Sequence, residues 1–347
     1  MIAGGPPPTV PDAWSVLRGL PVRPGDDGGL INLTWYAGEP VAWVAQRLHP
    51  AFGAVVHQDI EAITAHLAGK GLVTPRLVRT DAGELCHVVA QPGALDGVYR
   101  VMDYVPGRTH HRVSSAALAG AAGALVARFH AAVDDLEWSY RHVRPGAHDT
   151  PLHMRRLEEG LAAASGAGGS AEEARVVAEG ILDAWRTFPL ASLPVRHAHG
   201  DLKISNLRFD EHGQGVCLLD LDTLSALPLD VELGDAFRSW CNPKGEDDTD
   251  TFFDLDTFAA AIQGYQRVRA FTAEEREALP GAAERIALEL ASRFCRDVWD
   301  DNYFGWNAAK FPSRAAHNLF RAQGQLSLAR SARAGRAEAE RVLRSSG

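Results

Sequence analysis

Three polar residues near the middle of the chain have the types and the spacing that phosphoryl transfer requires. Asp201 stands five residues before Asn206, and Asp220 follows after two short apolar runs that flank the turn-rich segment 210–215. This pattern predicts a loop, a β-hairpin and a second loop, which would return Asp220 to the side of Asn206. A carboxylate and an amide oxygen are hard ligands of the kind that Mg²⁺ binds.

Asp201 is expected to lie across this site and to face an acceptor hydroxyl. Phosphoryl transfer needs in-line positioning, a metal that neutralises phosphate charge, and a group that orients or accepts the hydroxyl proton. Lys203, two residues after Asp201, would direct its ammonium toward the transferring phosphate. These residues therefore favour a kinase-type reaction.

Other interpretations of the same stretch explain less of it. One is a turn in which the side chains of Asp201 and Asn206 hydrogen-bond to the backbone. Another is the HxHxD pattern of His197, His199 and Asp201, as in binuclear metallohydrolases. The zinc version has a histidine directly after the aspartate, where this chain has Leu202. We interpret His199 as a packed, hydrogen-bonded loop residue.

The elements that must position these residues fall into two groups. Up to about residue 105 the pattern predicts strands with one helix, and after Pro106 it is mainly helical, with Ser114 or Ser115 as the first N-cap. The predicted strands are 30–36, 41–48, 76–79, 84–89 and 98–104, and the predicted helices are 58–69, 171–185, 256–268, 282–299 and 314–342.

We therefore expect an α+β fold of two lobes after a flexible N-terminal segment, 1–15. Residues 16–105 would form a nucleotide-binding lobe around a small antiparallel sheet. Residues 106–347 would form a larger helical lobe with the catalytic loop, the metal loop and the acceptor pocket. The hinge is expected at 104–107.

The nucleotide is expected to contact the small lobe at two places. Backbone amides of a glycine-rich turn would cover the ATP phosphates, with a plain hairpin turn as the alternative. Backbone groups at the hinge would hold the adenine. The residues assigned to these roles are Gly28, Gly29, Asn32, Thr34, Asp103 and Val105.

Arg47 is the candidate cation for the α- and β-phosphates, in a strand where protein kinases use lysine. Its acidic partner would be Asp59 or Glu61 on the following helix, and the sequence leaves both open. The alternative is that Arg47 is simply exposed on an edge strand.

Two motifs carry a family resemblance. Residues 199–206 (HGDLKISN) resemble the catalytic loop of aminoglycoside phosphotransferases, choline kinases and related small-molecule kinases, and 219–222 (LDLD) resembles their metal-binding motif. The resemblance implies a protein-kinase-like fold with Mg²⁺ and ATP as cofactors. It also implies that Asp201 is the catalytic aspartate, aided by Lys203, and that Asn206 and Asp220 are metal ligands. Asp222 would either assist the metal through water or brace the loop.

Within that superfamily the chain is most similar to the branch containing N-acetylhexosamine 1-kinase, over residues 25–305. The similar segments are 28–34 (GGLINLT), 46–48 (QRL), 234–238 (GDAFR), 289–297 (ELASRFCRD) and 301–304 (DNYF). The catalytic loop departs from that branch, with HGDLK in place of HNDTK. The tract 140–153 has no counterpart there.

Glu289, Arg293 and Asp297 have a spacing that places them on one face of a helix. If this face is exposed to solvent, the three residues would form a chain of ion pairs, each of which stabilises the helix by about 0.2–0.5 kcal/mol. The resemblance instead assigns them to a sugar pocket, whose hydroxyls pair with charged groups. Asp235 and Arg238 are expected to brace the catalytic loop.

Composition excludes several classes of protein. The 347-residue chain carries a net charge of −9 and no basic cluster, which argues against a nucleic-acid partner. Neither a long uninterrupted apolar run nor a secretory signal is present, and four scattered cysteines suggest reduced thiols in the cytoplasm. The acidic run 246–256 would line a pocket for a cationic substrate or, as we favour, form a solvated loop and a helix start.

We therefore expect an ATP-dependent kinase that transfers the γ-phosphoryl group to a hydroxyl of a sugar or amino sugar, such as an N-acetylhexosamine. One alternative is an aminoglycoside-type or other amino-alcohol phosphotransferase, whose pocket should be strongly acidic. The other is an inactive binding protein of the same fold, which the arginine at position 47 keeps open.

Overall fold

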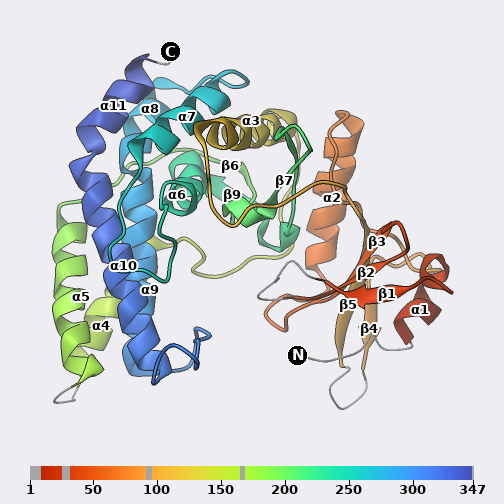
Figure 1. Cartoon of the computed structure of the whole chain (residues 1–347), viewed down its shortest axis with the longest axis horizontal. Coiled ribbons are helices and arrows are strands. Elements are labelled where there is room, and N and C mark those ends of the chain that lie inside the picture. Colours follow the sequence, from red (N-terminus) through yellow and green to blue (C-terminus); the bar gives the residue numbers. More distant parts are fainter. Residues whose placement is uncertain (1–8, 26–31, 91–95, 165–168, 346–347) are drawn as a thin grey trace.

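The computed structural model describes residues 9–25, 32–90, 96–164 and 169–345. These residues form two lobes, a small one built on a sheet and a larger one built of helices (Figure 1). The chain passes from one lobe to the other after strand β5 (Gly97–Asp103). The predicted two-lobed α+β fold is therefore confirmed.

The small lobe contains an antiparallel sheet in the order β1-β2-β3-β5-β4. Its other strands are β1 (Val22–Pro24), β2 (Leu33–Ala37), β3 (Trp43–Arg47) and β4 (His87–Val89). The predicted hairpin is the β2–β3 pair, in which Trp35 lies opposite Ala45. The strand expected at 76–79 is wrong, because this segment makes only an isolated bridge from Leu77 to Met102.

One face of the sheet is covered by the start of the chain. Helix α1 (Thr9–Ala13) leads to Trp14, whose ring is fully buried in a cluster with Ala45, Tyr99 and Val101. The Trp14 indole donates a hydrogen bond of 2.7 Å to the carbonyl of Val78. The prediction of a flexible segment through residue 15 is therefore wrong from residue 9 onward.

The other face of the sheet looks toward the large lobe and helix α2 (Val56–Gly69). Ile60, Ile63 and Leu67 of α2 are buried in the same core as Met102 of β5. This core continues into the large lobe, so the sheet is tied to the helices by apolar burial.

Helix α3 (Ala116–Val133) begins after Ser115, whose side chain accepts a hydrogen bond from the Leu118 amide. It is long and apolar enough to cross a membrane, but 67% of it is buried inside the protein. It packs closely on α7 (Leu255–Gln266), where a Cβ at Gly264 would lie 2.0 Å from the Gly120 carbonyl oxygen. Two glycines thus allow two helix backbones to touch.

Helix α9 (Ala282–Asp300) lies inside the large lobe, where it is packed by α4 (Thr150–Ala163), α5 (Ser170–Arg186), α6 (Leu229–Trp240) and α10 (Arg314–Ala334). The other helices are α8 (Ala273–Ala278) and α11 (Arg336–Ser345). Two short strand pairs join β6 (Val195–Ala198) to β9 (Ser225–Pro228) and β7 (Leu207–Phe209) to β8 (Gly215–Leu218). The single helix predicted over 314–342 is two helices that meet at Gly335.

Candidate active site

The loop between β6 and β7 is held in place by buried hydrogen bonds. The backbone amides of His199 and Gly200 donate to the two carboxylate oxygens of Glu232, at 2.7 and 2.9 Å. The fully buried His199 ring donates from Nε2 to the Leu219 carbonyl at 2.7 Å. His199 is therefore the packed loop residue that the sequence predicted.

A second brace fixes the next residue of this loop. The Leu202 amide donates to Asp235 at 3.0 Å, and its carbonyl accepts from the Trp240 indole at 2.7 Å. Arg238 holds the other oxygen of Asp235 at 3.1 Å. Asp235 and Arg238 thus support the loop from helix α6, as predicted.

Asp201 lies at the centre of a small polar cluster. Its Oδ2 accepts a hydrogen bond from Lys203 Nζ at 2.7 Å and another from Asn206 Nδ2 at 3.0 Å. Lys203 Nζ also lies 4.0 Å from an oxygen of Asp220. The structure therefore brings together the four residues that the sequence placed at the reaction centre.

The two carboxylates of this cluster have opposite electrostatic surroundings. Burial acts to raise the pKa of Asp201, but the Lys203 ammonium outweighs it and holds that pKa below its usual range. Burial and the neighbouring Asp222 carboxylate raise the pKa of Asp220. A further cation beside Asp220 would stabilise its charged form.

The residues present fit a divalent cation with oxygen ligands. Asn206 donates to Asp201 through its nitrogen, and its amide oxygen accepts no hydrogen bond from any residue that the structure describes. The Leu219 amide donates to the Asn206 carbonyl at 2.7 Å, so the two loops that carry Asn206 and Asp220 are tied together. Asp220 itself has a left-handed backbone, with φ of 58°.

Asp222 braces the loop rather than facing the metal ligands. It is 1% exposed and accepts hydrogen bonds from Asn32 at 2.7 Å and from both terminal nitrogens of Arg100. Arg100 comes from β5, so this contact joins the two lobes. The sequence did not single out Arg100, because an isolated arginine in a strand carries no local signal.

The predicted role of Arg47 is wrong. Arg47 shares a sheet face with Ala45, which lies under Trp14, whereas the cleft-facing side chains of β3 and β5 are those of Gln46 and Arg100. The Arg47 guanidinium donates to the carbonyl of Asp96. Successive strand residues point to opposite faces, so one position decides which lobe a side chain meets.

The two candidate partners of Arg47 have other contacts. Asp59 accepts hydrogen bonds from the Trp138 indole at 2.9 Å and from the backbone amides of Arg141 and His142 at 2.8 Å. Glu61 forms an ion pair of 3.2 Å with Arg79. Both alternatives are therefore wrong.

The remaining nucleotide candidates have mixed outcomes. Gly28 and Gly29 lie outside the described residues. Asn32 is committed to Asp222 and to the His49 amide at 2.9 Å, and Thr34 accepts a hydrogen bond from Gln46 at 3.1 Å.

At the hinge, two backbone amides are already used. The Asp103 amide donates to Arg76 and the Tyr104 amide to Ala42, each at 2.9 Å. The Val105 amide has no acceptor among the residues that the structure describes.

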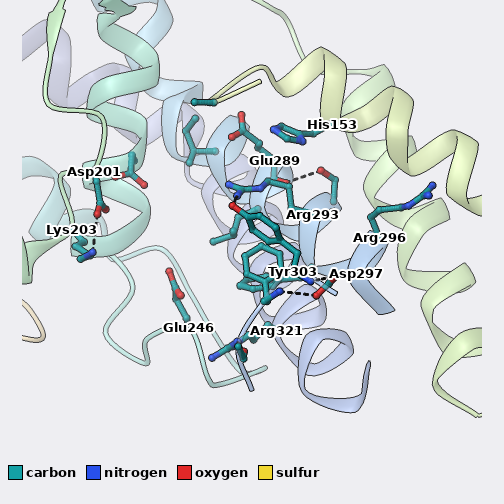
Figure 2. Close-up of a pocket in the computed structure, with 18 of the residues that line it drawn as sticks. His153, Asp201, Lys203, Glu246, Glu289, Arg293, Arg296, Asp297, Tyr303 and Arg321 are labelled. Atoms are coloured by element: carbon teal, nitrogen blue, oxygen red, sulfur yellow. Dashed lines mark hydrogen bonds and ion pairs between the residues drawn. The ribbon is translucent and has the colours of Figure 1, made fainter. Parts of the chain in front are cut away.

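A cleft of about 1760 Å³ opens beside the polar cluster, and Asp201, Lys203 and Asp220 line it. Glu289, Arg293 and Asp297 of α9 also line it, on the side opposite Asp201 (Figure 2). The structure therefore brings the predicted acceptor-pocket residues to the same cleft as the predicted reaction centre.

Glu289 is bound by residues of the tract 140–153, for which the sequence offered no role. One of its oxygens accepts a hydrogen bond of 2.7 Å from Thr150, and the other lies 3.4 Å from His148 Nδ1. Burial acts to lower the pKa of His148, but Glu289 outweighs it and raises that pKa to about 9. His148 Nε2 donates to the Gly200 carbonyl at 3.3 Å, which links α9 to the catalytic loop.

The Asp297 carboxylate is engaged within the chain. Its two oxygens accept hydrogen bonds from the backbone amides of residues 302–304 and from the Asn318 side chain, at 2.8 to 3.1 Å. It therefore shapes the loop after α9, and its assignment to the acceptor is wrong. A chain of ion pairs through Arg293 is also absent from the described residues.

The acidic run 246–256 has two parts. Glu246 and Asp247 line the cleft, but they pair with Arg238 at 2.6 Å and with Arg321 at 2.8 Å. Asp254 caps the start of α7 through the Asp256 amide. The expected helix start is confirmed, while the first two residues belong to the cleft.

The two-lobed fold and the position of the polar cluster at its cleft define a kinase-like phosphotransferase architecture. A model of the phosphotransferase enzyme family matches residues 24–271, and the chain belongs to this family.

Curated relatives include two homoserine kinases. That of Acidiphilium cryptum is 29% identical over 227 residues, which cover 64% of this chain and 65% of that protein. That of Chelativorans sp. is 32% identical over 227 residues, with 65% and 64% covered. The matches span just under two thirds of the length of these kinases.

Solved structures show the same fold. A microcompartment-associated aminopropanol kinase has a TM-score of 0.66 at 14% identity, with 94% of this chain and 97% of that chain covered. An aminoglycoside phosphotransferase from Alicyclobacillus acidocaldarius has a TM-score of 0.60 at 15% identity, with 94% and 95% covered. Amicoumacin kinase hAmiN, solved with AMP-PNP and Ca²⁺, has a TM-score of 0.58 at 11% identity, with 89% and 87% covered.

Proposed function

We propose that this protein transfers the γ-phosphoryl group of ATP to a hydroxyl of a small-molecule acceptor. The observation that carries the proposal is the placement of Asp201 at the cleft, with its carboxylate charged beside Lys203 and hydrogen-bonded to Asn206. A charged carboxylate can orient an acceptor hydroxyl and take its proton. Lys203, 4.0 Å from Asp220, would offset charge on the transferring phosphate.

Asn206 and Asp220 are proposed to hold Mg²⁺. When bound, the ion would neutralise charge on the ATP phosphates and fix their orientation. Two features of the chain prepare this site, namely the amide oxygen of Asn206 that accepts no hydrogen bond from the described residues and the crowding of Asp220 by Asp222 and Asp201. The presence of AMP-PNP and Ca²⁺ with the similarly folded amicoumacin kinase supports nucleotide and metal binding.

The adenine is proposed to bind at the hinge, where the Val105 amide has no acceptor among the described residues. Met102 precedes this segment on the cleft side of β5, where it would pack behind the base. Gly28 and Gly29 stay assigned to the phosphates. Arg100, which is fully buried against Asp222, is proposed to position the metal loop rather than to touch the nucleotide.

For the acceptor, a homoserine-like amino alcohol is the first candidate, because two homoserine kinases share 29% and 32% identity with the chain. A sugar or amino sugar, including an N-acetylhexosamine, is the second. It is favoured by Tyr303 and Trp306, which line the cleft and are 64% and 37% exposed, since flat aromatic rings suit the apolar faces of sugars. A polycationic aminoglycoside is disfavoured, because Glu246 and Asp247 are already paired with arginines.

The test is nucleotide consumption against a panel of acceptors. Purified protein with Mg-ATP would be offered L-homoserine, ethanolamine, choline, glucose, N-acetylglucosamine and kanamycin, and the phosphorylated product identified by mass spectrometry. We expect ADP to form only with one class of hydroxyl acceptor. Tight Mg-ATP binding without transfer to any acceptor would instead support an inactive binding protein. The free state of all four cysteines fits a reducing compartment, and we propose a cytoplasmic enzyme.

A further inference from the structure

Some charged side chains that line the cleft have partners of opposite charge among the described residues, and others do not. Three carboxylates of α9 that line the cleft have partners within the chain, since Glu289 pairs with His148, Asp297 binds backbone amides and Asp300 pairs with Arg296. Arg293, by contrast, has no carboxylate partner among the residues that the structure describes. An unpaired guanidinium that faces a cleft is suited to an anion.

Arg293 is also held in a fixed position. Its guanidinium carbon lies 5.6 Å from the centre of the Tyr303 ring and 5.5 Å from that of Phe304, and it donates a hydrogen bond of 3.3 Å to the Tyr303 hydroxyl. The loop that carries both rings is tied down by Asp297. Arginine stacked on aromatic rings keeps its remaining donors directed outward, where they can bind a planar anion at two points.

Arg293 and the proposed reaction centre line the same cleft. Glu289, one helical turn earlier on α9, is linked through His148 to the Gly200 carbonyl, which directly precedes Asp201. Asp201 and Arg293 therefore face the same cleft from two sides, as Figure 2 shows. An acceptor that binds with its hydroxyl at Asp201 and extends across this cleft would present its other end to Arg293.

We infer that the acceptor carries a carboxylate and that Arg293 binds it. This inference rests on the proposed kinase function and names the class of acceptor, a hydroxy acid or a hydroxy amino acid. Glu289 does not compete for Arg293, because its two oxygens are engaged by Thr150 and His148. A neutral hexose would leave the Arg293 donors without a charged partner. Its hydrogen bonds to Arg293 would then be weaker than those of a carboxylate.

The experiment compares acceptors that differ only in this group. L-homoserine would be tested against L-homoserine amide, and glucuronate against glucuronamide, by steady-state phosphorylation and by calorimetry in the presence of Mg and AMP-PNP. Wild type should prefer the carboxylate of a pair by about 10- to 100-fold in KM or Kd, the value of one charge-assisted hydrogen-bond pair. Arg293→Gln should remove this preference, and Arg293→Lys should retain part of it.

Arg296→Gln is the matched control, because Arg296 lies on the same helix and lines the same cleft but is paired with Asp300 at 2.7 Å. It should leave the carboxylate preference unchanged. Transfer to a neutral acceptor with equal efficiency in wild type and Arg293→Gln would overturn the inference and leave the kinase function standing. A carboxylate preference in calorimetry without transfer to any acceptor would support the inference and overturn the function. Absence of binding and transfer with every probe would overturn both.

Discussion

Arg100 and Asp222 form a buried ion pair that joins the two lobes. Each side chain is 1% exposed, Arg100 comes from the sheet, and Asp222 comes from the loop that carries Asp220. Gln46 and Asn32 complete the network, with hydrogen bonds to Arg100 at 2.7 Å and to Asp222 at 2.7 Å. The position of the metal loop relative to the sheet therefore depends on this pair.

Arg100→Met should lower the free energy of unfolding by about 3–5 kcal/mol, because it leaves the Asp222 charge buried without its partner. Urea unfolding followed by circular dichroism measures this. The double variant Arg100→Met with Asp222→Leu should recover much of the loss, since an apolar pair of similar size replaces both charges. The exposed pair Arg18–Asp81 is the control, where Arg18→Met should have a much smaller effect because solvent screens an exposed ion pair. Equal effects at both pairs would contradict the structural role of Arg100.

Asp220→Ala should weaken the binding of Mg-ATP, because it removes one of the two protein oxygens proposed to hold the metal. Calorimetry with Mg and AMP-PNP gives the dissociation constant, which should rise while the affinity for metal-free nucleotide changes little. Glu211→Ala, which alters an exposed carboxylate on the β7–β8 turn, is the control. If the Asp220 variant binds Mg-AMP-PNP as tightly as wild type, Asp220 is not a metal ligand.

Gly264→Ala should destabilise the protein by about 1–3 kcal/mol or more, because the new methyl group would overlap the Gly120 carbonyl oxygen in the α3–α7 contact. Thermal unfolding measures the change. Gly69→Ala, near the end of α2, meets no atom within 4 Å and should be neutral or stabilising by up to about 1 kcal/mol. A stable Gly264 variant would mean that α3 and α7 do not touch at this point.

The residues that sequence predicted best are those whose neighbours are close along the chain. Asp201, Lys203 and Asn206 lie within six positions, so their types and spacing already determine which side chains meet. Arg100 and Asp222 are 122 positions apart, and no local pattern indicates their contact. The sequence also placed the nucleotide cation at Arg47, the only cation in the predicted strand 41–48, although its side chain lies on the sheet face away from the cleft.

The late helix shows a different limit. Helical spacing placed Glu289 and Arg293 on one face of a helix, because position on a helix fixes the face, and the family resemblance assigned that face to the acceptor pocket. It did not reveal that Asp297 would be saturated by the backbone of residues 302–304, since that depends on how the following loop returns. Thr150 and His148 were missed because their partner, Glu289, lies about 140 positions away.

Stability should fall between neutral and alkaline pH through His148. Burial lowers its pKa and Glu289 outweighs this, with a smaller contribution from Asp235 and the Gly200 carbonyl, so that the folded pKa is about 9 against 6.5 for an unperturbed histidine. A raised folded pKa gives stability that is complete below pH 6.5 and is lost as pH rises through about 9. Each pKa unit corresponds to about 1.4 kcal/mol, so the loss between these two pKa values is at most roughly 3.5 kcal/mol.

His148→Asn is the test of this pH dependence, because asparagine tolerates the left-handed backbone at this position, where φ is 53°. The free energy of unfolding would be measured in urea from pH 6 to pH 10. The decline seen in wild type should be smaller in the variant. Parallel curves for the two proteins would show that the His148–Glu289 pair does not titrate in this range.

Asp201→Asn should abolish turnover while leaving the affinity for ATP and the melting temperature near wild type. Only contacts that are stronger in the transition state than in the ground state speed the chemistry, and Asp201 is proposed to contact the acceptor hydroxyl rather than the nucleotide. Asparagine keeps the size of the side chain and one oxygen acceptor for Lys203 and Asn206, but it removes the charge that accepts the proton. A positioned general base contributes about 10²–10⁴-fold to the rate, so kcat should fall by at least about 10²-fold.

The measurement is steady-state phosphorylation of the acceptor found in the panel, together with calorimetry of Mg-AMP-PNP binding and thermal unfolding. Asp210→Asn is the matched control, because Asp210 caps the β7–β8 turn through the amides of His212 and Gln214 and lies outside the polar cluster. It should retain wild-type turnover. Asp201→Asn could instead keep more than about a tenth of wild-type kcat. The loss would then be smaller than the weakest general-base effect, which is about 10²-fold. Asp201 would in that case be a scaffold for Lys203 and Asn206 rather than the base. A loss of nucleotide affinity in parallel with kcat would likewise place Asp201 in ATP binding, because a group that meets only the acceptor hydroxyl cannot change the ground-state affinity for the nucleotide.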